Sequence, residues 1–143
     1  MDQRVSMIMT GAQDVPKLRA FYEGGLGWTN WGPASDMSVM YKVGHSVLVL
    51  LNGAYLAHER GEPISQGSKT SLALFVESKA KVDDLYHRAL TAGATETSGL
   101  RDRDGGLYSG YFADPEGNSW EIVWSPHMPL DPDGALTLPG QNA

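Results

Sequence analysis

An internal repeat constrains the fold of this chain more than any other feature of its sequence. Four apolar residues at helical spacing in the first half recur 64 residues later in the second half without a gap. They are Leu18, Phe21, Tyr22 and Leu26 in the first half, and Val82, Leu85, Tyr86 and Leu90 in the second. Apolar residues three and four positions apart share one helix face. The repeat therefore predicts two similar helices, each with one buried face.

The segments around each helix predict strands. Residues 5–10 precede the first helix and residues 71–76 precede the second, which is capped by Ser78 and ended by Gly93. Three β-like stretches follow each helix, at residues 28–31, 37–43 and 46–51 in the first half and at residues 95–97, 107–113 and 119–124 in the second. This plan predicts an α+β fold built from two βαβββ modules.

The last two strands of each half are predicted to form a hairpin. Gly44 and His45 make the first turn, and residues 114–118 make the second. If Val43 pairs with Ser46, Tyr41 lies opposite Leu48. If Ala113 pairs with Ser119, Tyr111 lies opposite Glu121. In the last strand, alternation then directs Ser119, Glu121 and Val123 to one face and Trp120, Ile122 and Trp124 to the other.

The boundaries follow from these elements. We expect one domain over residues 1–143, with module one at 4–52, a linker at 53–69, module two at 70–126 and a C-terminal tail at 127–143. A chain of this length buries enough apolar surface to fold without disulfides or a metal. Neither the linker nor the Pro/Gly-rich tail has the pattern of a separate domain.

Composition excludes several classes of protein. The chain has no cysteine, which rules out disulfide frameworks, thiolate metal sites and a cysteine nucleophile. Its formal charge is −6 and its 11 Lys and Arg form no run, so a nucleic-acid partner is not expected. No apolar stretch is long enough to cross a membrane, and no secretory leader pattern opens the chain. We therefore expect a soluble, cytoplasmic protein.

Two segments carry a family resemblance. Residues 18–28, which contain Phe21-Tyr22 and Leu26-Gly27-Trp28, and residues 108–121, which contain Asp114-Pro115-Glu116-Gly117-Asn118, resemble the vicinal oxygen chelate superfamily. This superfamily includes glyoxalase I, bleomycin-resistance proteins and extradiol dioxygenases, and the resemblance covers roughly residues 4–126. It implies that each module curls into a half-barrel, that the paired half-barrels surround a central pocket with the helices outside, and that the protein is a homodimer.

The resemblance also implies where a metal would lie. Four inward positions hold the ion in the metal enzymes of the superfamily, and they fall here on Met7, Leu48 (or Leu50 if the strand slips), Ser71 and Glu121. Only Glu121 is a usual ligand, and no acid occurs between Asp36 and Glu59. A zinc or iron site needs about three N, O or S ligands. We therefore expect neither a metal nor another cofactor.

Glu121 and Tyr111 are the candidate catalytic residues. A carboxylate in a partly apolar site needs a hydrogen-bond donor, and Tyr111 beside it is the nearest one expected. The predicted ligand-binding set is Met7, Met9, Trp28, Tyr41, Leu48, Ser71, Tyr111, Ser119 and Glu121. Structural roles remain open for several of them: Glu121 as a solvated remnant, the tyrosines as wall residues, the methionines as filler and Trp28 as core packing.

Three functions remain in view at this level. The first is binding of a small, partly aromatic molecule by a metal-free protein, with sequestration of an antibiotic or metabolite as its role. The second is a metal-independent isomerase or lyase in which Glu121 moves a proton. The third is a divalent-metal-dependent enzyme of glyoxalase or dioxygenase type. Fold resemblance alone does not choose between them.

Overall fold

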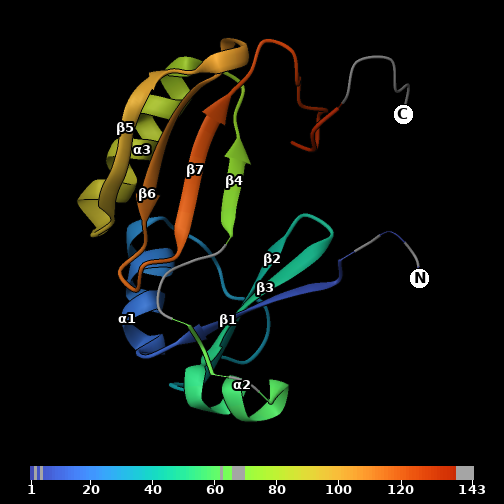
Figure 1. Ribbon diagram of the computed structural model, residues 1–143, viewed down its shortest axis with the longest axis vertical. Helices are drawn as coiled ribbons and strands as arrows, with labels where there is room; N and C mark the ends of the chain where they lie inside the picture. Colours follow the sequence, from blue (N-terminus) through green and yellow to red (C-terminus); the bar gives the residue numbers. More distant parts are fainter. Residues whose placement is uncertain (2, 4, 62, 66–69, 138–143) are drawn as a thin grey trace. The chain divides into compact units, whose positions relative to one another are not determined.

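The computed structural model describes residues 1, 3, 5–61, 63–65 and 70–137. It forms two compact units, Met1–Gly67 and Ser68–Ala143. Each unit contains a β-sheet with a helix packed on one face (Figure 1). The expected α+β fold with two βαβββ-type modules is confirmed. Residue 4, parts of the expected linker (62 and 66–69) and the end of the expected tail (138–143) lie outside the described residues.

The first unit has a sheet with the strand order β1-β3-β2. Strand β1 runs parallel to β3, and β2 pairs with β3 as an antiparallel hairpin. The elements are β1 (Met7–Ala12), α1 (Val15–Arg19), the π-helical turn η1 (Ala20–Gly25), β2 (Ser38–Val43), β3 (Ser46–Asn52) and α2 (Gly53–Arg60).

The first helix begins at a side-chain cap and ends in a widened turn. The Asp14 carboxylate accepts a hydrogen bond from the Lys17 N–H at 2.9 Å, and this satisfies one free donor of the first turn. At the other end, the Leu26 N–H donates to the Phe21 carbonyl five residues earlier, at 2.9 Å. Helix α1 and η1 together bury Leu18, Phe21 and Tyr22 against the sheet, as the repeat predicts.

The stretch at residues 28–31 differs from the prediction. It forms no strand, although it reaches β2 at its end, where the Trp31 N–H donates to the Met40 carbonyl at 2.7 Å. Just after the stretch, the Ser35 N–H donates to the Ser38 carbonyl at 2.9 Å. Glycine and proline surround this stretch in the sequence and interrupt a regular ladder. The first module therefore keeps the path of the βαβββ plan with an irregular segment in place of one strand.

Helix α2 lies in the segment expected to be a linker. The Asn52 side chain caps it by accepting a hydrogen bond from the Tyr55 N–H at 3.0 Å, and Gly61 ends it with a left-handed backbone at φ +75°. Leu56 is the buried residue of this helix. With so little apolar periodicity, the segment had no helical pattern to detect.

The second unit has a sheet with the strand order β4-β7-β6-β5. Ser78 caps its helix by accepting a hydrogen bond from the Lys81 N–H at 3.1 Å, and Gly93 ends it at φ +114°, both as predicted. The elements are β4 (Ser71–Phe75), α3 (Lys79–Ala92), β5 (Thr95–Asp102), the 3₁₀ turn η2 (Asp104–Gly106), β6 (Tyr108–Ala113) and β7 (Ser119–Trp124).

Both hairpins have the predicted register. Val43 pairs with Ser46, which places Tyr41 opposite Leu48. Ala113 pairs with Ser119, which places Tyr111 opposite Glu121. No helix in the described part of the chain is long and apolar enough to cross a membrane.

Candidate functional site

Tyr86 of helix α3 identifies the two faces of the second sheet. The Tyr86 ring packs closely on β6: a Cβ added at Gly110 would lie only 2.6 Å from the ring. The ring also contacts Phe112, with the two ring centroids 6.3 Å apart. Gly110 and Phe112 therefore face the helix. Because successive strand residues point to opposite faces, Tyr111 and its partner Glu121 lie on the other side. We call the face of each sheet opposite its helix the open face.

The open face of the second unit carries a small polar cluster. Glu121 lies beside Tyr111 on one side and beside Ala73 on the other. One step along, the hydroxyls of Ser71 and Ser119 are hydrogen bonded to each other at 2.6 Å. The structure thus brings four predicted ligand-binding residues onto one face: Ser71, Tyr111, Ser119 and Glu121.

Tyr111 is held in its neutral form. Burial raises the pKa of its hydroxyl, and its hydrogen bond with Glu121 and the negative charge of that carboxylate raise the pKa further. The nearby Arg103 charge acts in the opposite direction. At neutral pH the Tyr111 hydroxyl therefore donates a proton to the hydrogen bond, and Glu121 is the acceptor.

Arg103 is the residue of this cluster that sequence analysis missed. Its guanidinium carbon lies 5.0 Å from the centroid of the Tyr111 ring, within the range of a cation–π contact. It follows strand β5 and precedes two glycines, in a stretch that also contains Arg101. Nothing in that pattern distinguishes Arg103 from an exposed turn residue, so the sequence alone could not have found it.

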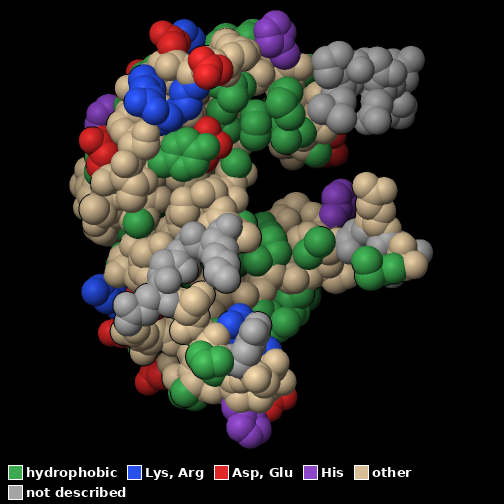
Figure 2. Space-filling view, in the orientation of Figure 1, with side chains coloured by type: hydrophobic (Ala, Val, Ile, Leu, Met, Phe, Trp, Pro, Cys, Tyr) green, Lys and Arg blue, Asp and Glu red, His purple; other side chains and the backbone are tan. Residues whose placement is uncertain are grey.

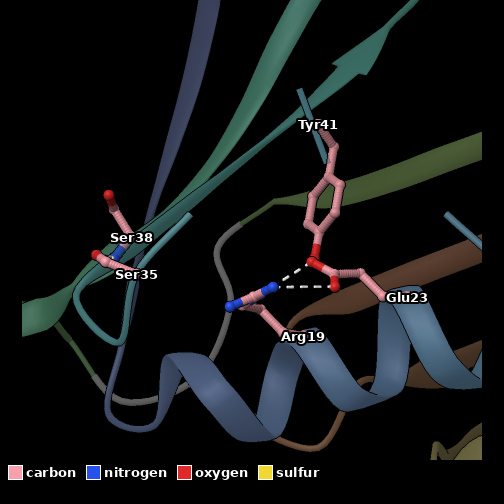
Figure 3. A network of polar contacts seen from close by, with 5 residues as sticks. All are labelled: Arg19, Glu23, Ser35, Ser38 and Tyr41. Carbon is pink, nitrogen blue, oxygen red and sulfur yellow. Dashed lines mark hydrogen bonds and ion pairs between the residues drawn. The ribbon is translucent and has the colours of Figure 1, made fainter. Parts of the chain in front are cut away.

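In the first unit, three predicted site residues lie on the helix side of the sheet. The Tyr41 hydroxyl donates to Glu23 in η1 at 3.3 Å (Figure 3). The Tyr41 ring packs against Trp28, with centroids 5.3 Å apart. Leu48, the hairpin partner of Tyr41, is only 2 % exposed. The prediction therefore placed these residues on the wrong face: Tyr41 and Leu48 lie in the core beneath the helix, and the half-buried Trp28 packs against Tyr41 on the same side.

The cause of this error is a shift of one residue between the two halves. On the open face of the second unit, Glu121 pairs with Tyr111 and Ala73. On the open face of the first unit, the corresponding residue is Val49, which pairs with Met40 and Met9. Strand β3 is apolar from Val47 to Leu51, so alternation of polar and apolar residues could not identify its faces. Leu50, the alternative position, is also in the core at 1 % exposure.

Met7 and Met9 lie on the open face of the first unit. They pair with Val47 and Val49, which are buried but point away from the helix-side residues Leu48 and Leu50. Met7 is 44 % exposed and Met9 is 56 % exposed, which is high for large apolar side chains. The side chains that this face presents at Met7 and Met9 are soft and adaptable, and neither is ionisable.

A charged network lies under the first sheet. Arg19 donates to both carboxylate oxygens of Glu23, at 2.9 and 3.2 Å (Figure 3). This hydrogen bond from Arg19, followed by its positive charge and the hydrogen bond from Tyr41, lowers the pKa of Glu23 despite partial burial. Burial, together with the Glu23 charge, raises the pKa of Tyr41. These groups hold η1 on the sheet and are directed away from the open face.

The residues at the family's metal positions do not fit a divalent ion. Met7, Ser71 and Glu121 offer a thioether, a hydroxyl and one carboxylate, and the open-face residue of β3 is the aliphatic Val49. Zinc and iron sites use about three imidazole, carboxylate or thiolate ligands. Among the described residues, no group of three His, Cys, Asp or Glu side chains is placed to hold a metal.

Comparison with known proteins establishes the family. The model of the Glyoxalase/Bleomycin resistance protein/Dioxygenase superfamily matches residues 4–122. The chain therefore belongs to this superfamily, and the resemblance found in the sequence is confirmed. No curated protein matches the chain.

Several solved structures share the fold. A glyoxalase-related enzyme from Fulvimarina pelagi is 28% identical, with a TM-score of 0.89 and coverage of 96% of this chain and 99% of that one. A family enzyme from Burkholderia phytofirmans PsJN is 25% identical, with a TM-score of 0.72 and coverage of 83% and 96%. The fosfomycin resistance protein FosX from Mesorhizobium loti is similar in fold alone, at 17% identity, a TM-score of 0.64 and coverage of 87% and 94%.

Proposed function

We propose that this protein binds a small, partly aromatic organic molecule without a metal, and that binding serves to sequester it. The observation that carries the proposal is the polar cluster of Tyr111, Glu121, Ser71 and Ser119 on one open face. A few polar groups converging among small and apolar residues are typical of ligand sites. Membership of a superfamily that includes resistance proteins supports the same reading.

Glu121 determines what kind of ligand fits. No Lys, Arg or His of the described residues forms an ion pair with it, and its one assigned donor is the Tyr111 hydroxyl. An ionised carboxylate offers about four acceptor positions, so most of them remain for a ligand. We therefore expect a ligand that presents N–H or O–H donors, with an aromatic part that packs on apolar side chains.

The charge of the molecule favours the same kind of ligand. The chain carries a formal charge of −6. On the face seen in Figure 2, the acidic side chains are spread over the surface rather than gathered in one place. A net negative field raises the local concentration of neutral and cationic molecules relative to anions.

The Tyr111–Glu121 pair also supports a second candidate, a metal-independent isomerase or lyase. In an isomerisation, Glu121 would take a proton from a carbon next to a substrate carbonyl. The Tyr111 hydroxyl would turn from Glu121 and donate its one hydrogen to the carbonyl oxygen as that oxygen gains negative charge. Glu121 would then return the same proton to a different atom. The carboxylate and the hydroxyl would end in their starting states, so no other reactant is needed.

A thermal-shift screen against planar metabolites and antibiotics tests the binding proposal. A ligand present at 100 times its Kd stabilises the folded protein by about 2.7 kcal/mol, which is readily seen as a rise in Tm. Glu121→Gln should reduce that rise, and Glu77→Gln, the same change at an exposed carboxylate, should leave it intact. A screen without any stabilising compound would remove the support for sequestration.

The same variants distinguish binding from catalysis. If Glu121 only anchors the ligand, Glu121→Gln weakens affinity and no compound found in the screen is converted. If Glu121 moves a proton, Glu121→Gln abolishes conversion while affinity is retained, because the amide still fills the position but accepts no proton.

We further propose, from the family resemblance, that the protein is a cytoplasmic homodimer. Light scattering on the purified chain measures its molar mass directly. A mass equal to that of one chain at micromolar concentration would contradict the dimer.

A further inference from the structure

Arg103 lies where the edge strand β5 returns to β6. Its N–H donates to the Leu107 carbonyl at 2.7 Å and closes the turn. Along these two strands the pairing register shifts twice, between Glu96 and Ser98 and again between Ser98 and Arg101. Irregular pairing of this kind bends a strand and turns its side chains in new directions. Strand β6 pairs with β7 in regular register, so the irregularity is confined to the pairing of β6 with the edge strand β5.

The guanidinium of Arg103 spans the irregular stretch and binds both strands. Its Nε donates to the Ser109 hydroxyl on β6 at 2.6 Å. Its Nη2 lies 3.2 Å from the Ser98 hydroxyl and 3.2 Å from the Gly99 carbonyl on β5. The Ser109 and Ser98 carbonyls are also within reach of Nη2, at 3.3 and 3.4 Å. Only the planar, multidonor head of arginine can satisfy both strands at once.

The same guanidinium rests against the Tyr111 ring, 5.0 Å from its centroid. Ser109 and Tyr111 are two residues apart in β6, so both face the open side, and Ser109 is fully buried there. On the other side of β6, the Tyr86 ring packs on the neighbouring Gly110, and its hydroxyl, which donates to Glu96 at 2.7 Å, also lies 3.2 Å from the Tyr111 carbonyl. The main chain of Tyr111 is therefore held from one side and its ring from the other.

We propose that Arg103 is the positioning residue of this site: by bridging β5 and β6 and packing on the Tyr111 ring, it holds the Tyr111 hydroxyl directed at Glu121. This role rests on the proposed function in so far as Tyr111 and Glu121 meet the ligand. When the Tyr111 ring is held rigidly, its hydroxyl always donates to the same acceptor position of the Glu121 carboxylate. The remaining positions then select ligands by the placement of their donors.

Nuclear magnetic resonance of the tyrosine rings tests the proposal without any ligand. In protein labelled with ¹³C in its tyrosine rings, Tyr111→Phe identifies the signals of Tyr111. Arg103→Gln is expected to shift these signals and to increase the mobility of the ring in ¹³C relaxation measurements. The signals of Tyr55, an exposed tyrosine of helix α2 in the first unit, should stay unchanged.

Two further variants complete the design. Ser109→Ala removes the acceptor of the shortest Arg103 hydrogen bond and should loosen the Tyr111 ring in the same direction, to a smaller extent. Arg101→Gln removes the same charge from an exposed position two residues away and should have no effect on Tyr111. If Arg103→Gln unfolds the chain, Ser109→Ala carries the test.

The proposal is overturned if folded Arg103→Gln or Ser109→Ala protein shows a Tyr111 ring as rigid and as unshifted as in the unmodified protein. It is also overturned if all tyrosines change together, since Arg103 would then be a general structural residue. Neither result depends on a ligand. A failed ligand screen and a failed positioning role are therefore separate outcomes.

Discussion

Two tyrosines of this protein, Tyr41 and Tyr111, use their hydroxyls in different surroundings. Tyr41 and Tyr111 hold related places in the two hairpins, yet one hydroxyl binds a carboxylate beneath a helix and the other binds a carboxylate on an open face. The local partner determines the role in both cases: Glu23 is already paired with Arg19, whereas Glu121 has no ion pair among the described residues. Only the second carboxylate has acceptor positions left for another molecule.

At this scale we predict that Tyr41→Phe destabilises the protein by about 1 kcal/mol, the usual net value of one hydrogen bond. The lost donor is the Tyr41 hydroxyl that lies 3.3 Å from Glu23. Urea titration with fluorescence detection measures the change. Tyr55→Phe, at a side chain 53 % exposed, is the control and should have an effect within about 0.5 kcal/mol of zero.

The pH dependence of this effect has a definite sign. Glu23 has a lower pKa in the folded protein than in the unfolded chain, so its ionised contacts stabilise the fold above the unfolded pKa. That contribution is lost as the pH falls through the folded pKa. The difference between Tyr41→Phe and the unmodified protein should therefore shrink in acid, and a constant difference would argue against the Glu23 contact.

At the scale of elements, close packing between helix α3 and strand β6 fixes which face of the second sheet is open. Gly110 permits this approach because any side chain there would meet the Tyr86 ring. A tyrosine packed directly on the strand then leaves its hydroxyl beside Glu96, at 2.7 Å, and beside the Tyr111 carbonyl. A glycine on one face of β6 thus supports Tyr111, the tyrosine of the proposed site, on the other.

Gly110→Ala should cost about 1–3 kcal/mol, the range found for overpacked cores. The added Cβ would lie 2.6 Å from the Tyr86 ring and 3.0 Å from the Leu100 side chain, so the helix or the strand must move. Gly24→Ala is the matched control, because nothing lies within 4 Å of its added Cβ and alanine favours helix. Thermal unfolding should show a lower Tm for the first variant and an unchanged or higher Tm for the second.

A hydrogen bond between β6 and α3, from Tyr108 to Asp83, predicts that the folded protein loses stability at alkaline pH. The hydrogen bond from the Tyr108 hydroxyl to Asp83, 2.6 Å long, together with burial, raises the pKa of Tyr108 to about 12. Because this pKa is raised on folding, the contribution is complete below the ordinary tyrosine pKa of about 10 and is lost as the pH rises through 12. Tyr108→Phe should abolish the fall in Tm that deprotonation of Tyr108 causes at alkaline pH. Asp83→Asn should shift this fall in Tm to lower pH.

The helices and strands show which parts of the fold could be predicted from the sequence. The four repeated apolar residues predicted both helices, and the turn residues at Gly44 and at 114–118 predicted both hairpin registers. Helix α2 was missed because Leu56 is its buried residue and no periodicity marks it. Trp28, Tyr41 and Leu48 were assigned to the wrong face because β3 is apolar on both sides. Arg103 was missed because its partners come from a register shift, which no local pattern encodes.

At the scale of the whole molecule, the chain keeps the architecture of its superfamily while its donor set no longer suits a metal. The match covers residues 4–122, yet of the four family positions only Glu121 carries a usual ligand. The same architecture then presents an apolar open face in one unit, with Met7 and Met9, and a polar one in the other.

Elemental analysis of purified protein should accordingly find zinc, nickel, iron and manganese each well below one atom per chain. Treatment with a chelator should leave the Tm unchanged, because the folded state would have no ion to lose. The opposite result, near-stoichiometric metal that is lost in Glu121→Gln, would show that additional ligands complete a site at this carboxylate.

The one-residue shift between the halves has a consequence for comparing this chain with its relatives. Counting along the sequence equates Glu121 with Leu48, a residue of the core, but strand pairing equates it with Val49. Duplicated modules can therefore diverge by a shift in strand register as well as by substitution. A register shift of one residue moves every side chain of the strand to the opposite face of the sheet. Alignments that seek the ancestral ligands of such chains should match strands by the side each residue presents.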